Sequence, residues 1–253
     1  MKKITRLRDL LFFLTLILPT IILLVLFFGT LEVLGILKIH GKNNLPKLPI
    51  KKYKNNGHQS GLLLIANHPS FYEPLILGYI FVIYIVRNPF KYFPYSCPDF
   101  NNFNKWYWSI FKERFIFFNR SNKRLCAIAC SKAIRILKRG RIVIIHPEGG
   151  RTSSCPVDQV LLSTKNGDQL RPIGPMAVRM AIKSHCLIIA AWVKGTEEAM
   201  PRGTKLPKFW KKVDIYLGKP FKLSKKENKE NIEKGQKIFA KKLLDLATHK
   251  KDD

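Results

Sequence analysis

Two short apolar runs, each followed directly by a polar cluster, constrain the fold of this chain most. The run at 62–66 leads into residues 67–73, Asn-His-Pro-Ser-Phe-Tyr-Glu, and the run at 142–145 leads into residues 146–153, His-Pro-Glu-Gly-Gly-Arg-Thr-Ser. Apolar runs of this length, rich in branched residues, predict buried β-strands. In α/β proteins the side chains that carry chemistry lie beyond the ends of such strands. Together the two clusters indicate one functional site.

Strand-like and helix-like segments alternate along the rest of the chain. Further strands are predicted at 115–118, 187–193 and 213–217. Helices are predicted at 74–86, from an N-cap at Ser121 to Gly140, at 176–183, and at 224–246. This alternation predicts an α/β fold, with a single domain built on a mostly parallel sheet flanked by helices.

The charge of the chain is strongly positive. Lysine and arginine number 45 against 17 aspartates and glutamates, for a formal net charge of +28. A charge of this size indicates an anionic partner: nucleic acid, anionic lipid, an acidic carrier protein or a phosphorylated substrate. Composition alone leaves these four classes open.

The N-terminus predicts a membrane anchor. Residues 10–28 are apolar apart from Thr15, Pro19 and Thr20, and basic residues precede them. As one helix they would be about 28 Å long, close to the hydrocarbon core of a bilayer. Pro19 leaves two arrangements open, one kinked span or two short interfacial helices. The lysine-rich flanks and the five cysteines without framework spacing predict that the body of the chain lies on the cytoplasmic face of the membrane.

Residues 87–112 are crowded with aromatic and basic side chains. Such a segment suits a membrane interface, single-stranded nucleic acid or the core beneath a long loop. The apolar N-terminus favours the membrane over nucleic acid, and no helix-turn-helix, zinc-finger or RNA-binding signature is present. We therefore expect membrane lipids, including anionic lipid, as partners, and no nucleic acid.

The polar clusters contain the groups that acyl transfer needs. His68 can act as a general base, and Glu73, with four residues between them, can orient its imidazole. The glycines of the second cluster let backbone amides approach an anion, and Arg151 offers a bidentate grip on phosphate. Each pattern alone also fits ordinary structure: a histidine at a helix N-terminus, or a turn with a surface arginine.

Five segments in order resemble the membrane glycerolipid acyltransferases of the 1-acylglycerol-3-phosphate acyltransferase (PlsC-like) family, whose hallmark is a histidine and an aspartate separated by four residues. The matching segments are 67–73, 115–120 (Phe-Ile-Phe-Phe-Asn-Arg), 146–152, 187–195 and 215–221. The resemblance spans about residues 58–222, and the apolar N-terminus fits it too.

The resemblance implies a role in phospholipid biosynthesis. A fatty acyl group would pass from acyl-carrier protein or acyl-CoA to a lysophospholipid, most simply 1-acylglycerol-3-phosphate, giving phosphatidic acid. His68 would be the base and Glu73 its partner, Arg120 and Arg151 would bind the phosphate, and Glu148 and Gly149 would shape that pocket. The family uses no metal, no cofactor and no covalent acyl-enzyme.

Several residues depart from the family pattern. Glu73 stands in place of the usual aspartate, His146 and Gly150 replace a phenylalanine and a threonine, and Asn119 stands where an aspartate is frequent. Residues 153–171 form a longer segment than usual, and a lysine that often precedes the next helix is missing. A non-catalytic or weakly active membrane lipid-binding relative is therefore an alternative, and a basic membrane-anchored nucleic-acid-binding protein is a less favoured one.

The sequence predicts four parts: an anchor at 1–37, a basic connector at 38–57, an acyltransferase domain at 58–222, and a lysine-rich C-terminal helix and tail at 223–253.

Overall fold

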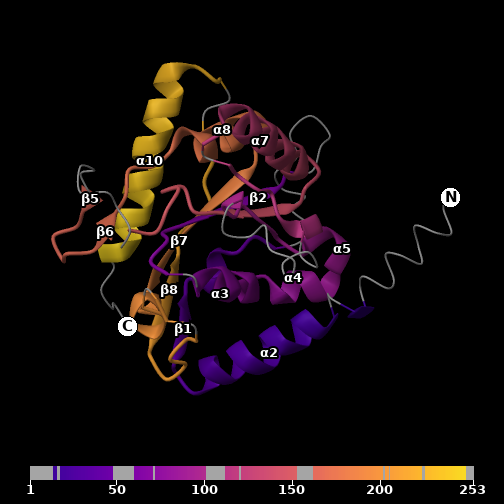
Figure 1. The fold of residues 1–253 in the computed structure, drawn as a ribbon, viewed down its shortest axis with the longest axis vertical. Coiled ribbons are helices and arrows are strands. Elements are labelled where there is room, and N and C mark those ends of the chain that lie inside the picture. Colours follow the sequence, from indigo (N-terminus) through magenta and orange to yellow (C-terminus); the bar gives the residue numbers. More distant parts are fainter. Residues whose placement is uncertain are drawn as a thin grey trace, which may run out of the picture.

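The computed structural model describes residues 14–15, 18–47, 60–70, 72–100, 112–119, 121–152, 162–201, 203–204, 206–223 and 226–248. These residues form a central sheet with helices packed on both of its faces (Figure 1). The predicted α/β fold with a mostly parallel sheet is confirmed.

The central sheet has six strands in the order β1-β8-β7-β2-β4-β3. Strands β7, β2, β4 and β3 run parallel, whereas β8 is antiparallel to β7 and parallel to β1. The strands are β1 (Leu37–His40), β2 (Leu62–Ala66), β3 (Tyr95–Ser96), β4 (Ile142–Ile145), β7 (Leu187–Lys194) and β8 (Val213–Leu217). A separate antiparallel hairpin pairs β5 (Leu162–Ser163) with β6 (Gln169–Leu170).

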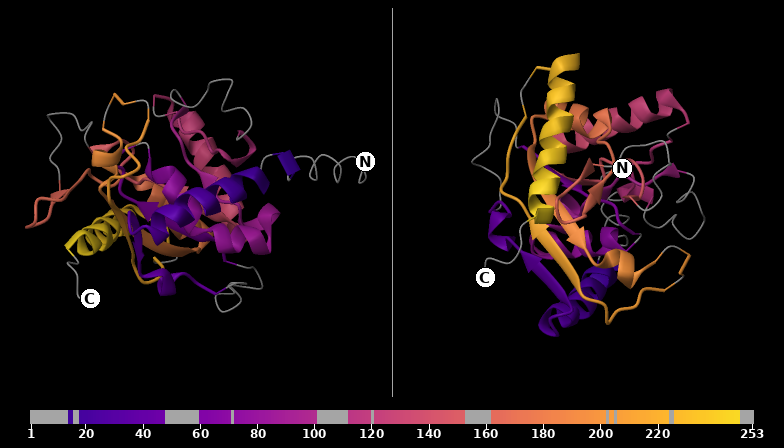
Figure 2. Two further views of the ribbon diagram at one scale, coloured as in Figure 1. Left: turned by 90° about the horizontal axis from the view of Figure 1, so that it is seen from below. Right: turned by 90° about the vertical axis from the view of Figure 1, so that its left-hand side faces the viewer.

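The helices divide between the two faces of the sheet, each over its own apolar core. Along β2 the side chains alternate, so that Leu62, Leu64 and Ala66 join one core and Leu63 and Ile65 the other. The first core packs against α2 (Leu18–Val33), α3 (Glu73–Ile80) and α4 (Val82–Arg87). The second packs against α7 (Lys123–Lys138), α8 (Pro175–Ser184) and α10 (Lys229–Thr248), which lie at the opposite end of the molecule from α2 in the right-hand view of Figure 2. The fold also contains two short helices, α5 (Pro89–Tyr92) and α9 (Thr196–Ala199), and a 3-10 turn, η2 (Lys42–Asn44).

Several predicted elements have different bounds in the structure. The helix predicted at 74–86 is divided into α3 and α4 at Phe81. The strand predicted at 115–118 contributes only isolated bridges, from Phe115 to Ser96 and from Phe118 to Asp99. Helix α7 is capped by Asn122, whose side chain accepts a hydrogen bond from the backbone of Leu125, and not by Ser121.

Strand β1 was not predicted, and it includes residues 38–40 of the expected connector. It pairs with β8 in a register that places Leu37 beside Val213. His40 fastens the pair, because its Nε2 lies 3.0 Å from Asp214 Oδ1 and its ring stacks on Tyr216. Residues 41–47 of the connector are also described and contain η2, whereas residues 48–57 lie outside the described residues.

The lysine-rich C-terminal helix is part of the domain. Phe239 and Leu243 of α10 are fully buried in the second core, while the lysines of the helix face outward. Helix α10 is therefore an amphipathic helix whose apolar face packs against the sheet.

Helix α2 makes up most of the described part of the predicted membrane anchor. Pro19 is its second residue, where the missing amide hydrogen leaves no intrahelical bond unmade. Along the residues that the structure describes, no helix combines the length and the apolar character needed to cross a membrane. Residues 1–13, 16 and 17 of the predicted anchor lie outside those residues.

Gly61 is a residue at which the fold tolerates no side chain. A Cβ there would lie 2.3 Å from the carbonyl oxygen of Leu137 and 2.7 Å from that of Arg141. We expect Gly61→Ala to lower the free energy of unfolding by about 1–3 kcal/mol, because backbone at both contacts must shift. Gly78→Ala is the matched control: nothing lies within 4 Å of its Cβ position inside α3, so stability should hold or rise by up to about 1 kcal/mol. Urea denaturation of both variants tests this, and equal stabilities would contradict it.

Candidate active site

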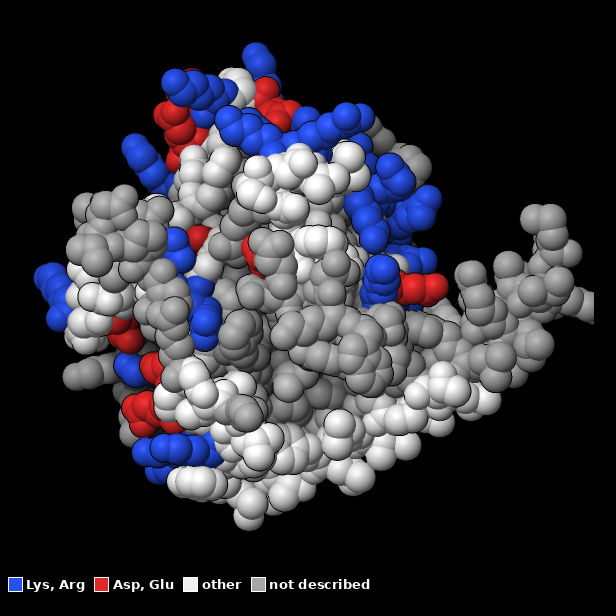
Figure 3. Space-filling view, in the orientation of Figure 1, with Lys and Arg blue, Asp and Glu red and all other residues white. Residues whose placement is uncertain are grey.

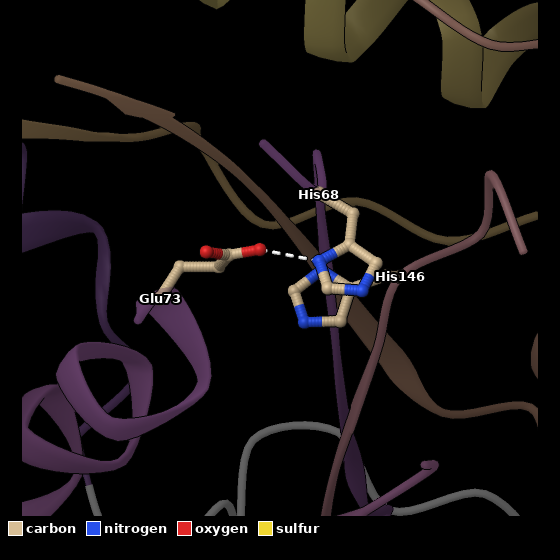
Figure 4. Close-up of side chains that lie close together, drawn as sticks. All are labelled: His68, Glu73 and His146. Atoms are coloured by element: carbon tan, nitrogen blue, oxygen red, sulfur yellow. Dashed lines mark hydrogen bonds and ion pairs between the residues drawn. The ribbon is translucent and has the colours of Figure 1, made fainter. Parts of the chain in front are cut away.

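The parallel pairing of β2 with β4 brings the two polar clusters together. The register sets Leu62 beside Ile142 and Ile65 beside Ile145, so both strands end at the same edge of the sheet. His68 follows β2 and His146 follows β4, and their rings stack with centroids 4.3 Å apart and an interplanar angle of 18° (Figure 4). Residues about eighty positions apart in sequence thus share one site.

His68 and Glu73 are in direct contact. Nδ1 of His68 and Oε1 of Glu73 form a hydrogen-bonded pair, with the carboxylate reaching from the first residue of α3 (Figure 4). The Glu73 side chain is fully buried, whereas 16% of the His68 side chain is exposed. The glutamate therefore reaches the imidazole despite its extra methylene, and the histidine keeps access to solvent.

Ser70 holds the carboxylate of Glu73 from the other side. Its backbone amide lies 3.1 Å from Oε2, and its hydroxyl donates to the same oxygen over 2.8 Å. The hydroxyl also accepts from the amide of Tyr72 at 3.0 Å. Ser70 is 1% exposed and was not predicted as a site residue. A serine inside a tight turn three residues before a buried acid is the pattern that could have indicated it.

Burial decides the ionisation of Glu73. Removal from water raises the pKa of its carboxyl to about 7, against the lowering effects of His146 and of the hydrogen bonds from Ser70. The fold therefore favours the protonated carboxyl more than the unfolded chain does. This contribution to stability is present at low pH and is lost as the pH rises through about 7.

Glu148 ties three segments of the site together. One of its carboxylate oxygens accepts from the amide of His68 at 2.7 Å, and the other accepts from the Thr152 hydroxyl and the Arg171 amide, both at 2.8 Å. The amide of Thr152 in turn donates to the carbonyl of His68 over 3.0 Å. Burial raises the pKa of Glu148. Its contacts are with the protein itself, so it fixes the geometry around His68.

Asn67 extends the pairing of β2 with β7 by one residue. Its side-chain amide donates to the carbonyl of Val193 at 2.8 Å and accepts from the Val193 amide at 2.7 Å. The side chain is only 3% exposed. This pair of bonds fixes the backbone from which His68 projects, a second positioning role that the sequence did not reveal.

His146 is held as a neutral imidazole. Its Nδ1 lies 2.9 Å from the carbonyl oxygen of Asn67 and so carries the hydrogen of that bond. Burial, followed by the proximity of His68, lowers the pKa of His146 to about 4. His146 therefore adds an uncharged aromatic surface beside His68 at neutral pH, as the phenylalanine of the family pattern would.

The three side chains His68, Glu73 and His146 bring potential metal ligands within 4.8 Å of one another. Imidazole lone pairs lie in the ring plane, and the two rings are nearly parallel. His68 also uses its Nδ1 to contact Glu73, and His146 donates from its Nδ1 to the carbonyl of Asn67. The ring planes do not converge on a point, so the arrangement fits a proton-handling site better than a metal centre.

The predicted phosphate-binding residues are only partly described. Gly149 has a left-handed φ of 71° and closes a turn by donating to the His146 carbonyl over 3.1 Å. Arg151 follows that turn and precedes Thr152, whose amide bonds to His68, so it lies in the loop beside the base. Arg120 lies outside the described residues. The loop that contains Arg151 and the base His68 belong to one site, whereas the role of Arg120 in phosphate binding stays a prediction.

Comparison with known proteins identifies the family. A family model described as Acyltransferase matches residues 36–194, more than half of the chain. The chain belongs to the acyltransferase family. The match begins just before β1, in agreement with the place of that strand in the sheet.

A solved structure is similar to this acyltransferase in fold. It is the crystal structure of the 1-acyl-sn-glycerophosphate (LPA) acyltransferase PlsC from Thermotoga maritima, with a TM-score of 0.51 and 18% sequence identity. The match covers 90% of this chain and 81% of that chain. No curated protein sequence matches this acyltransferase.

We expect Ser70→Ala to slow acyl transfer and to lower stability. The substitution removes the hydroxyl that orients Glu73 and leaves the buried amide of Tyr72 without its acceptor. The free energy of unfolding should fall by about 1–3 kcal/mol, and kcat by roughly tenfold. Ser121→Ala, at an exposed serine, is the control and should change neither. Steady-state kinetics and urea unfolding measure both effects, and an unchanged kcat in Ser70→Ala would contradict the positioning role.

The pH profile of the reaction should show the ionisation of Glu73. Because burial raises its pKa to about 7, the ionised partner of His68 is lost as the pH falls through that value, and the rate should fall with it. Glu73→Gln cannot ionise and should lower kcat by about 10² or more above pH 7, with a smaller difference from wild type at lower pH, where Glu73 is itself protonated. A wild-type rate that stays constant from about pH 6 to pH 8 would contradict this assignment.

Proposed function

We propose that this acyltransferase moves a fatty acyl group from acyl-CoA or acyl-carrier protein to the hydroxyl of a lysophospholipid. The proposed acceptor is 1-acylglycerol-3-phosphate and the product phosphatidic acid. The observation that carries the proposal is the hydrogen-bonded pair of His68 and Glu73 beside the loop that contains Arg151. A base with its orienting acid, next to a loop suited to an anion, matches the needs of a phosphate-bearing alcohol.

In the proposed reaction His68 acts through Nε2, because Nδ1 faces Glu73. Nε2 takes the proton of the acceptor hydroxyl as its oxygen attacks the thioester carbonyl carbon. The tetrahedral intermediate then expels the thiolate, which receives the proton from Nε2. The ester is complete, the donor leaves as a free thiol, and His68 returns to its neutral form. Glu73 stabilises the imidazolium between these steps.

The acceptor phosphate would lie against the loop at residues 149–152. Gly149 and the turn that it closes set the path of the chain, and Glu148 holds that path to the backbone of His68. Arg151 would supply the charge. Arg120 is included on the resemblance to the family alone.

We propose a membrane containing anionic lipid as the place of this reaction, with the catalytic domain on its cytoplasmic face. Helix α2 supports this, because it presents a row of exposed apolar side chains. They are Leu18, Ile22, Leu23, Val25, Leu26 and Val33. In Figure 3 the lower edge of the molecule, where α2 lies in Figure 1, carries neither lysine and arginine nor aspartate and glutamate.

A non-catalytic lipid-binding protein is the second candidate, suggested by the glutamate in place of aspartate. The contact of Glu73 with His68 weighs against it, because the longer side chain still reaches the imidazole. No described feature of the structure adds support for a nucleic-acid-binding function, and we expect no nucleic-acid partner.

The test is acyl transfer by the purified protein in detergent, with 1-acylglycerol-3-phosphate and either donor. We expect His68→Ala to lower kcat by about 10³ or more, through loss of the base, and Glu73→Asp to retain part of the activity. The matched controls are His185→Asn, whose left-handed backbone (φ 52°) suits asparagine, and Glu233→Asp on the exposed face of α10. Both should behave as wild type.

Each outcome assigns the protein differently. Transfer to another lysolipid only would keep the chemistry and change the acceptor. A folded protein that transfers to no acceptor would contradict the proposal and favour lipid binding. Equal rates in His68→Ala and wild type would exclude His68 as the base.

A further inference from the structure

A basic and aromatic turn between α9 and β8 is not accounted for by the site. The amide of Lys211 donates to the carbonyl of Lys208 over 3.0 Å, which makes Phe209 and Trp210 the central residues of the turn. Trp210 is 70% exposed, and nearby Leu206 is 77% exposed. Large apolar side chains so exposed at one tip are unfavourable in water unless they have a partner.

The turn is held firmly in place beside α2. The ring of Phe209 packs edge-on against Phe27 of α2, with centroids 4.8 Å apart, and lies 6.1 Å from the ring of Tyr72. The amide of Lys208 donates to the carbonyl of Ala199 over 2.6 Å. Phe209 thus anchors the turn, and Trp210 is left pointing away from the core.

The exposed apolar surface is continuous across the turn and the helix. Next to Phe27 along α2 are Leu23 and Leu26, which are 66% and 65% exposed. Phe27 itself touches Phe209, so the turn adjoins the apolar face of α2. One surface therefore combines a helix face and a loop tip from positions about 180 residues apart in sequence.

The charge around the turn restricts its partner. Residues 206–212 read Leu-Pro-Lys-Phe-Trp-Lys-Lys, with three lysines and no acidic residue. Lys208 and Lys212 are exposed, and Lys211 lies 3.7 Å from Glu198. Tryptophan prefers the headgroup level of a bilayer, and lysines beside it attract anionic lipid.

We propose that the turn at 206–212 is a second membrane contact, which inserts Trp210 and Leu206 into the interface of an anionic bilayer beside α2. Lys208 and Lys212 lie at the headgroups. The inference goes beyond the proposed function, because it concerns where the domain meets the membrane and requires no acyl transfer.

The experiment places Trp210 relative to the lipid. The full chain is reconstituted into phosphatidylglycerol and phosphatidylcholine vesicles whose acyl chains are brominated, and tryptophan fluorescence is recorded. Trp106→Phe and Trp108→Phe leave two tryptophans, of which Trp192 is buried at 3% exposure. We expect bromolipid quenching in this protein and its loss in the further variant Trp210→Phe.

Two matched variants serve as controls. Ile238→Trp, combined with Trp210→Phe, places a tryptophan on the partly exposed Ile238 of α10, over the opposite core, and should not be quenched. Lys208→Glu with Lys212→Glu should remove the dependence of quenching on phosphatidylglycerol. Circular dichroism and urea unfolding confirm that the variants fold alike.

Three results would overturn the proposal. Absence of bromolipid quenching in the protein that retains Trp192 and Trp210, or equal quenching before and after Trp210→Phe, would show that Trp210 does not reach the lipid. Equal quenching in neutral vesicles would remove the role of the lysines. Protection of Trp210 by an acidic carrier protein without lipid would assign the turn to a protein partner. Because none of these readouts uses turnover, failure here and failure of acyl transfer are distinguishable.

Discussion

The parallel register of β2 and β4 is the constraint on which the site depends. Ile65 beside Ile145 sets the point at which both strands stop, and the stacked rings of His68 and His146 follow directly. A slip of one residue would turn every side chain of β2 to the opposite face of the sheet. Because Leu62 to Ala66 are buried on both faces, such a slip would exchange the side chains of two packed cores. The chemistry is therefore positioned by the packing of the sheet.

Two buried carboxylates in contact with His68 have different roles. Glu148 accepts hydrogen bonds from two backbone amides and a hydroxyl and fixes the backbone, whereas Glu73 faces the imidazole and Ser70. Both have a raised pKa because both are removed from water. A buried charge is tolerated when its oxygens are satisfied by donors, and each of these carboxylates has several. Among the interactions described, the donors that preorganise the site are backbone amides, hydroxyl groups and the imidazole of His68.

The sequence predicted the parts of the fold whose signal is local. The apolar runs of β2, β4 and β7 marked the sheet, and the polar residues after two of them marked the site. Strand β1 was not predicted from the sequence, because it is an edge strand with only Leu37 buried and therefore has no apolar run. The reversed direction of β8 is a tertiary feature with no local pattern. The positioning roles of Asn67 and Glu148 depend on contacts between distant segments, which spacing along the chain does not encode. The contact of Ser70 with Glu73 is local, and the serine three residues before the acid could have indicated it.

The pairing of β1 with β8 has a consequence for how the chain folds. The strand that begins at Leu37 finds its partner only at Val213, so this edge of the sheet cannot close until most of the protein has been synthesised. Contacts so distant in sequence form late, because the intervening chain must first be ordered. Helix α2 precedes β1, so it emerges from the ribosome well before β8, the strand with which β1 pairs. During synthesis the apolar residues of α2 are thus exposed before the sheet against which they pack is complete.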